Sequence, residues 1–176
     1  MILILVALLH AGCGDDPPSS PAARSGPGWP SAEMRTLQDG HAPTPFTADQ
    51  IRQGCPSGRT STFLTESDAQ GRGFLVIRFV RADAEGVTTS VEFLDEKRQP
   101  TRTPPMQRAT WEELQRHASF PSAATTVREE VVEVPAGRFA CMVYEVGEPS
   151  EGADVSTRYD FARAMPGMPI RVLKSQ

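Results

Sequence analysis

The feature that most restricts the fold of this chain is a period of two in its apolar residues between positions 60 and 173. In the segment VTTSVEFLD (87–95), Val87, Val91 and Phe93 fall on one face and alternate with mostly polar residues. Such alternation is typical of a strand with one buried and one exposed face. The preceding segment FLVIRFVRA (74–82) is apolar on most of both faces, which predicts a more deeply buried strand.

Five further segments predict strands, at 60–65, 126–134, 138–146, 155–164 and 170–173. Short turns such as PAG (135–137) join successive strands, and strands joined in this way pair in antiparallel fashion. The stretch EKRQPTRTPPMQR (96–108) predicts a loop, because its consecutive prolines exclude regular pairing.

Two short helices are indicated by capping signals. Thr47 and Gln50 have the spacing of a capping box, and so do Thr110 and Glu113. Helices of about two turns are not stable alone, so both must pack on the strands. The sequence therefore predicts an α+β domain, mostly β, over residues 46–176. Its expected form is a curved antiparallel sheet of about seven strands with two short helices.

The N-terminal residues have the composition of an export signal. Ile2–Leu9 is an apolar run well short of the roughly 20 residues that span a bilayer, and it fits the apolar centre of a secretory signal. Ala11 and Gly12 then lead to Cys13, an arrangement that resembles a bacterial lipobox. The resemblance implies a lipoprotein-type signal peptide over residues 1–12, with Cys13 as the lipidated first residue. An ordinary signal and a truncated apolar end remain the alternatives.

Residues 13–45 differ in composition from the rest of the chain. Seven prolines lie between Gly14 and Pro45, with serine and glycine among them. A segment of this kind buries too little apolar surface to fold, so we expect a disordered tether between the lipid and the domain. Trp29 is its one large apolar residue in the early part, and it would either enter the membrane interface or dock on the domain.

The three cysteines divide into one and two. If Cys13 carries lipid, Cys55 and Cys141 remain as a pair that an oxidising compartment would allow to bond. We predict a Cys55–Cys141 disulfide. The alternative is two separate buried thiols that behave as small apolar side chains.

No motif predicts a catalytic, cofactor-binding or metal site. The segment GCPSGR (54–59) has three residues between its glycines and arginine in place of lysine, so it does not match a phosphate-binding loop. After removal of the signal only His41 and His117 remain, and neither has a second ligand at helical spacing. We therefore expect no cofactor and no metal.

The charged residues exclude one class of partner. The net charge is −4 and the isoelectric point is about 5.4, which offers no basic surface for nucleic acid. Three acids cluster on one predicted strand, where Glu129 and Glu133 share a face and Glu130 takes the other. We interpret them as solvated side chains, since a carboxylate pair in a cleft cannot be recognised from sequence.

A second resemblance covers about fifty residues. A strand that ends in Val-Pro-Ala-Gly (134–137) is followed by G-x-F-x-C-x-x-Y (137–144) and later by PGMP (166–169), a pattern similar to poorly characterised bacterial envelope lipoproteins. The predicted topology is also similar to periplasmic half-barrel carriers of lipids or lipoproteins. These likenesses imply a fold, and fold alone does not assign an activity. The carriers are usually soluble, whereas the lipobox resemblance at Cys13 implies a lipid-anchored, extracytoplasmic location in the bacterial envelope.

Three functions follow as hypotheses. The first is a non-enzymatic, lipid-anchored envelope protein that contacts the membrane through its lipid and binds another protein or has a structural role. The second is a protein that binds a lipid or other hydrophobic ligand on the concave face of the sheet, which predicts apolar side chains that two helices do not cover. The third is a hydrolase, which predicts a cleft that holds carboxylates of raised pKa.

Overall fold

The computed structural model describes residues 4–8, 28–68, 71–148 and 155–175, and these are mostly β. The strands are β1 (Ile4–Leu8), β2 (Thr60–Ser67), β3 (Gly71–Ala82), β4 (Gly86–Asp95), β5 (Pro100–Arg102), β6 (Gln107–Thr110), β7 (Thr125–Val134), β8 (Gly137–Glu148), β9 (Val155–Ala162) and β10 (Arg171–Ser175). The helices are α1 (Ala32–Arg35), α2 (Ala48–Gly54) and α3 (Trp111–Arg116), with a 3₁₀ turn, η1, at Ser122–Ala124.

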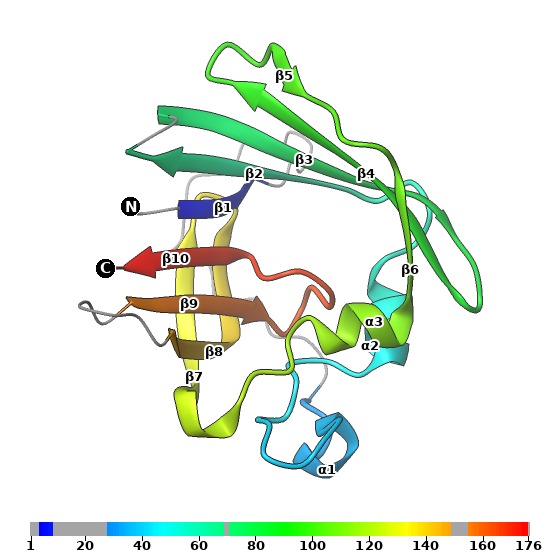
Figure 1. Cartoon of the computed structure of the whole chain (residues 1–176), viewed down its shortest axis with the longest axis vertical. Helices are drawn as coiled ribbons and strands as arrows, with labels where there is room; N and C mark the ends of the chain where they lie inside the picture. The colour runs from blue at the N-terminus through cyan, green and yellow to red at the C-terminus, as the bar shows by residue number, and fades with distance from the viewer. Residues whose placement is uncertain (1–3, 9–27, 69–70, 149–154, 176) are drawn as a thin grey trace, which may run out of the picture.

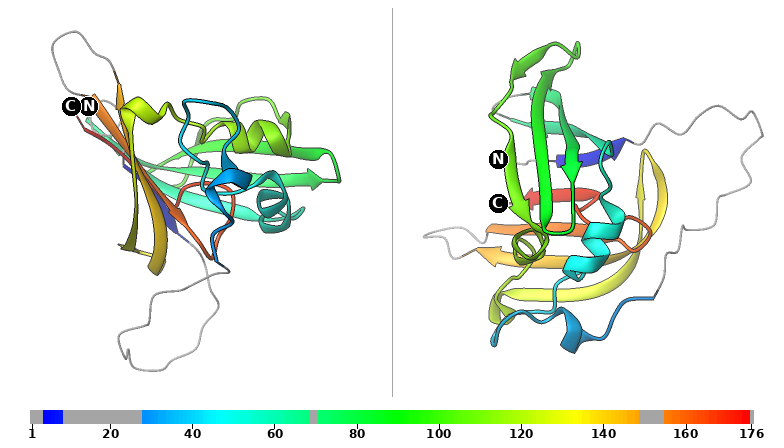
Figure 2. Two further views of the ribbon diagram at one scale, coloured as in Figure 1. Left: turned by 90° about the horizontal axis from the view of Figure 1, so that it is seen from below. Right: turned by 90° about the vertical axis from the view of Figure 1, so that its right-hand side faces the viewer.

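The strands form two antiparallel sheets, which β1 links into one continuous ten-stranded ladder (Figure 1). One contains β2, β3 and β4, with β5 and β6 both paired to β4. The other runs in the order β10, β9, β8, β7. β1 lies between β2 and β10 and pairs with both, so it joins the two sheets. Figure 2 shows strands of the two sheets running in different directions, with α2 and α3 on the open side between them.

The mostly β class and the antiparallel pairing are thus confirmed, but the single curved sheet of about seven strands is wrong. The expectation of two helices is also wrong, because the described residues contain a third, α1. The chain leaves the first sheet through α3 and η1 and begins a second meander at β7. Which distant strands become neighbours depends on contacts far apart in sequence, and the local pattern carries no information about them.

The predicted loop at 96–108 contains the short strand β5 and the first two residues of β6. Pro104 and Pro105 lie between them, where they interrupt neither pairing to β4. The prolines therefore mark the gap between two strands, and the expectation of a loop throughout was wrong.

Both predicted capping boxes are present. The Thr47 hydroxyl accepts a hydrogen bond from the backbone N–H of Gln50, whose side chain accepts one from the N–H of Thr47. Thr110 and Glu113 make the same reciprocal pair in front of α3. These caps satisfy backbone donors at the start of helices that are too short to persist without packing.

The buried side chains form two cores, which lie largely on opposite faces of β8. The helix-side core lies under α2 and α3 and includes Phe46, Ile51, Phe79, Val87, Trp111, Met142, Tyr144 and Phe161. The strand core includes Phe63, Val132, Phe139, Cys141, Val143 and Ile170. Alternation along β8 assigns Met142 and Tyr144 to the first and Cys141 and Val143 to the second.

This division explains why the predicted disulfide is absent. Cys55 and Cys141 are both buried free thiols. Cys55 belongs to the helix-side core and Cys141 to the strand core, so β8 itself separates them. The prediction of a Cys55–Cys141 bond was wrong, and the alternative of two separate buried thiols describes the structure.

Part of the segment expected to be a disordered tether is folded. Trp29 docks on the domain, with its ring centroid 5.4 Å from that of Phe46 and the Arg163 guanidinium 5.2 Å from its ring. Arg35 is buried and donates hydrogen bonds to the carbonyl oxygens of Pro30 and Thr44. Residues 28–45 therefore belong to the folded part of the protein, whereas residues 9–27, Cys13 included, lie outside the described residues.

Candidate functional site

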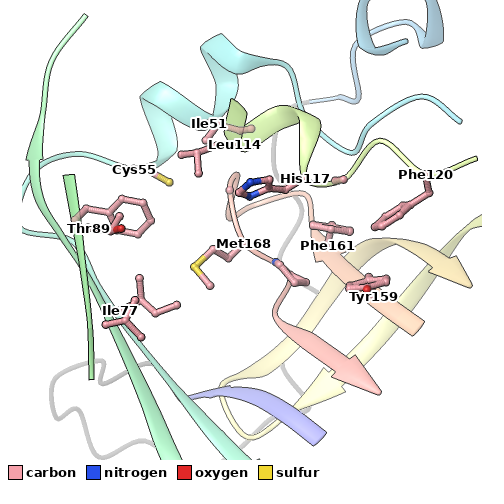
Figure 3. A pocket seen from close by; sticks show the side chains of 15 residues that line it. Ile51, Cys55, Ile77, Thr89, Leu114, His117, Phe120, Tyr159, Phe161 and Met168 are labelled. Carbon is pink, nitrogen blue, oxygen red and sulfur yellow. The ribbon is translucent and has the colours of Figure 1, made fainter. Parts of the chain in front are cut away.

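An apolar pocket of about 320 Å³ lies between the two sheets, beneath α2 and α3 (Figure 3). Ile77, Phe79 and Val91 contribute its wall from the five-stranded sheet. The opposite wall comes from the four-stranded sheet and its adjoining loops and includes Phe120, Tyr159, Phe161 and Met168. Ile51 of α2 and Leu114 of α3 cover the remaining side.

Strand register explains the first wall. Ile77 lies opposite Val91 and Phe79 lies opposite Thr89 across the β3–β4 ladder, so all four point to the same face of the sheet. On the helical side, Leu114 of α3 and Ala118, in the turn that follows α3, line the pocket. The alternating pattern of β3 and β4 thus directs the residues of the first wall inward.

An aromatic stack forms the second wall. The Phe120 and Tyr159 rings stack with centroids 4.9 Å apart, and Tyr159 and Phe161 stack at 6.3 Å. Phe161 also meets Tyr144 edge-on at 5.6 Å. Such a wall presents flat, rigid apolar surfaces at low entropic cost, as apolar ligand sites commonly do.

Few polar groups reach the pocket. The exposed His117 forms the C-cap of α3 and lines the pocket, and Thr89 and Tyr159 lie on opposite walls (Figure 3). The sequence singled out His117 only as an isolated histidine, and the structure places it at this pocket. The mostly apolar lining favours binding of an apolar molecule over hydrolytic chemistry.

Cys55 forms part of the pocket wall as a neutral thiol. Burial raises the pKa of its thiol, although the Arg59 guanidinium, 3.5 Å from the sulfur, acts in the opposite direction. Gly167 packs so closely that a β-carbon there would come within 2.7 Å of the Cys55 sulfur. The site therefore needs glycine at 167, where φ is +120°.

The segment Gly54–Arg59, rejected as a phosphate loop, has a structural role. Arg59 donates hydrogen bonds to the carbonyl oxygens of Gly54 and Pro166, the latter at 3.0 Å. The guanidinium thus connects the end of α2 to the 166–169 loop, which contributes Gly167, Met168 and Pro169 to the pocket lining. Since its donors point at backbone oxygens, it is engaged in holding the site together.

The face of the four-stranded sheet that carries the strand core also carries an arginine–carboxylate ladder. Its contacts run in order through Glu145, Arg128, Glu130, Arg158, Asp160 and Arg171. Asp160 is completely buried and accepts from Arg158 at 2.8 Å and from Arg171 at 2.5 Å. The ladder spans all four strands and is a stabilising network.

The three clustered acids of the sequence are now placed. Glu130 belongs to the ladder, and its hydrogen bond from Arg158 lowers the pKa of its carboxyl. Glu129 lies on the other face and pairs with Arg163 at 2.7 Å. Glu133 is exposed on that same side. The structure therefore does not bring the three together in one cleft.

Carboxyl groups with shifted pKa values do not indicate a general acid. Among the described residues, Asp83, Glu113, Glu130 and Glu145 all have a lowered pKa, caused chiefly by hydrogen bonds from arginine or backbone N–H groups. A general acid at neutral pH needs a shift in the opposite direction. The described residues also contain no group of three or more potential metal ligands.

Sequence reasoning did not identify the pocket. Its apolar face on β3 and β4 was visible as Ile77, Phe79 and Val91, which gave the only available signal. Met168 and Phe120 come from loops whose positions depend on tertiary contacts, and no local pattern marks them.

Comparison with known proteins identifies no relative. No protein-family model, curated protein or solved structure matches the chain. Within the described residues, no helix is long and apolar enough to cross a bilayer.

Proposed function

We propose that this protein is a lipid-anchored, extracytoplasmic binding protein that takes a small apolar ligand, such as a single acyl chain, into the pocket between its two sheets. The observation that carries the proposal is the pocket itself, about 320 Å³ in volume and lined mostly by aromatic and aliphatic side chains. Ligand pockets typically measure ~300–1,000 Å³, so this one has room for a small ligand or one chain.

The local packing supports this proposal. Close-packed interiors leave few voids larger than a water molecule, so an apolar cavity of this size is unusual in a fold that otherwise fills its core. Core side chains are closed to solvent in both cores: Phe139 and Val143 of the strand core are 1% and 0% exposed, and Phe46 and Tyr144 of the helix-side core are likewise 1% and 0% exposed.

The anchoring part of the proposal rests on the sequence. Ala11-Gly12-Cys13 follows an apolar run, and the lipobox that it resembles places a lipid on Cys13. Residues 13–27 would then separate the membrane from Trp29, the first large side chain that docks on the domain. A tether of this length has a reach of roughly 20 Å, by the ~5–6 Å × √n scaling of flexible chains.

Binding is tested with a series of saturated fatty acids that displace an apolar fluorescent probe, N-phenylnaphthylamine, from the purified protein. Each buried methylene contributes ~0.8 kcal/mol, so affinity rises about fourfold per methylene until the pocket is full and then levels off. Affinity that is independent of chain length, or the absence of probe binding, would contradict the proposal.

A pair of matched variants locates the binding. Val91→Trp places an indole in the pocket, whereas Val131→Trp places one on an exposed face of β7. We expect the first to weaken probe binding about tenfold or more and the second to leave it unchanged. Thermal unfolding of both variants identifies any loss that reflects misfolding, and equal effects of the two substitutions would place the binding elsewhere.

A further inference from the structure

The strand between the two sheets comes from the segment that the sequence assigns to the signal peptide. β1 pairs with β2 from Ile4 opposite Glu66 to Leu8 opposite Thr62, and with β10 from Ile4 opposite Leu173 to Val6 opposite Arg171. Cleavage before Cys13 would remove this strand. Residues 4–8 therefore cannot serve both as a discarded signal and as a permanent part of the mature sheet.

Removal of β1 would leave two rows of backbone groups without partners. Residues 62–66 of β2 and 171–173 of β10 would face each other across the width of one strand, roughly 10 Å, or twice the ~4.8 Å strand spacing. Unpaired strand edges are ready templates for another strand, and buried backbone groups without partners are costly.

Direct pairing of β2 with β10 would not repair this opening easily. Both strands are antiparallel to β1 and hence parallel to each other, so they would have to approach by about one strand spacing, ~4.8 Å. Phe63 of β2 and Ile170, next to β10, are buried in the same strand core at 2% and 1% exposure. A shift of that size would displace side chains that already fill this core.

We propose that the opening between β2 and β10 in the mature protein is a strand-acceptor site that takes an extended apolar segment of another polypeptide. This inference rests on the processing at Cys13 that the proposed function includes. The incoming segment runs antiparallel to both neighbours, as β1 does. Main-chain hydrogen bonds on both of its edges supply affinity, the mode by which sheets accept added strands.

The present occupant indicates the chemistry of the partner. The segment seated between the two strands is ILVAL, five consecutive apolar residues. Its neighbours on β2 include Phe63 and Leu64, which also belong to or pack against the strand core. A partner segment therefore needs at least five apolar residues in extended form without proline.

The test begins with protein purified from a bacterial host after natural processing, whose intact mass establishes cleavage before Cys13. The probe is a synthetic ILILVALL peptide flanked by lysines for solubility. Hydrogen exchange of residues 62–66 and 171–173 is measured with and without it. Successive N–H groups of a strand point to opposite sides, and those that face β3 or β9 keep their partners. We therefore expect only the amides that face the opening to exchange rapidly in the mature protein, and to exchange about tenfold or more slowly with the peptide bound.

Two controls define the result. The same peptide with proline at the position of Val6 cannot donate a central hydrogen bond and should not protect either strand. A Cys13→Ser chain that remains uncleaved keeps β1 in place and should not bind the peptide. A mature chain that folds only when the peptide is present would also support the inference.

Three outcomes would overturn the inference. They are protection, without peptide, of the β2 and β10 amides that face the opening, no change in their exchange on adding the peptide, or a natural product that still contains residues 4–8. Probe binding to the apolar pocket, measured on the same samples, separates this failure from that of the proposed function. A protein that binds fatty acids but no peptide would support the proposed ligand pocket and contradict the proposed strand-acceptor site.

Discussion

The helix-side core and the strand core are built from similar residues and packed differently. The first is closed by helices of seven and six residues and leaves a pocket of about 320 Å³. The second lies among strands held in register by backbone ladders and is bordered by the arginine–carboxylate ladder. Both cores are rich in apolar side chains, so composition does not explain why only one of them contains the pocket. The difference lies in the elements that enclose each core, two short helices in one case and paired strands in the other.

The difference has a functional meaning. Short helices make few hydrogen bonds to their surroundings and can adjust, whereas a four-stranded ladder resists deformation. Ligand sites commonly combine a rigid support with an adaptable cover. Here the four-stranded sheet supplies support, and α2 and α3 supply the cover.

The largest expected loss of stability comes from truncating a buried aromatic side chain, and its size should differ between the two cores. Phe139→Ala removes a ring that is 1% exposed in the strand core and should cost about 3–5 kcal/mol of unfolding free energy. Phe120→Ala, at the half-buried pocket wall, should cost only ~1–2 kcal/mol because part of its surface already faces the pocket. Urea unfolding measures both, and equal costs would remove the distinction between the cores.

The second effect concerns the buried charge. Asp160→Asn leaves Arg158 and Arg171 without their carboxylate in a buried position, which should cost about 3 kcal/mol. The control Glu129→Gln breaks the exposed pair with Arg163 and should change stability by less than ~1 kcal/mol. Chemical denaturation of the two variants tests the ladder, and a neutral Asp160→Asn would show that it adds no stability.

The smallest effect is a pH dependence. Hydrogen bonding from Arg158 lowers the pKa of Glu130 below its usual 4.5, so the folded state favours the ionised carboxylate. This contribution is present above pH 4.5 and is lost as the pH falls through the lowered pKa. The free energy of unfolding should therefore fall less steeply with acid in Glu130→Gln than in the parent protein.

Glu133→Gln is the matched control for this titration. Glu133 lies on the exposed face of the same strand, and the part of the chain that the structure describes contains no salt bridge to it. Below neutral pH, the free energy of unfolding of Glu133→Gln should therefore fall with acid as it does in the parent protein. Identical slopes for Glu130→Gln and the parent would show that the ladder does not respond to pH.

Local elements could be predicted well from the sequence. The capping residues Thr47 and Thr110 mark helices that begin where expected, and the turn at 135–137 joins β7 to β8. The alternation in 87–95 correctly assigns Val91 to an inward face. These features depend on interactions between residues within a few positions of each other, so the local sequence is sufficient to predict them.

The candidate site could be predicted only in part. Ile77 and Phe79 were recognisable as one face of a strand, but that face alone does not reveal a pocket. The opposite wall, including Phe120 and Met168, comes from loops that approach only after the two sheets assemble. The docking of Trp29 was likewise undecided, since its partner Phe46 and its cation Arg163 are distant in sequence from one another.

By itself, the sequence determined the mostly β class, the starts of α2 and α3, the hairpin turns and the faces of individual strands. Only the tertiary structure decided that there are two sheets, that Cys55 and Cys141 lie in separate cores, and that a pocket remains between the sheets. The physical reason is that side-chain periodicity and caps act over a few residues, whereas strand partners and cavities result from packing between segments that are far apart along the chain.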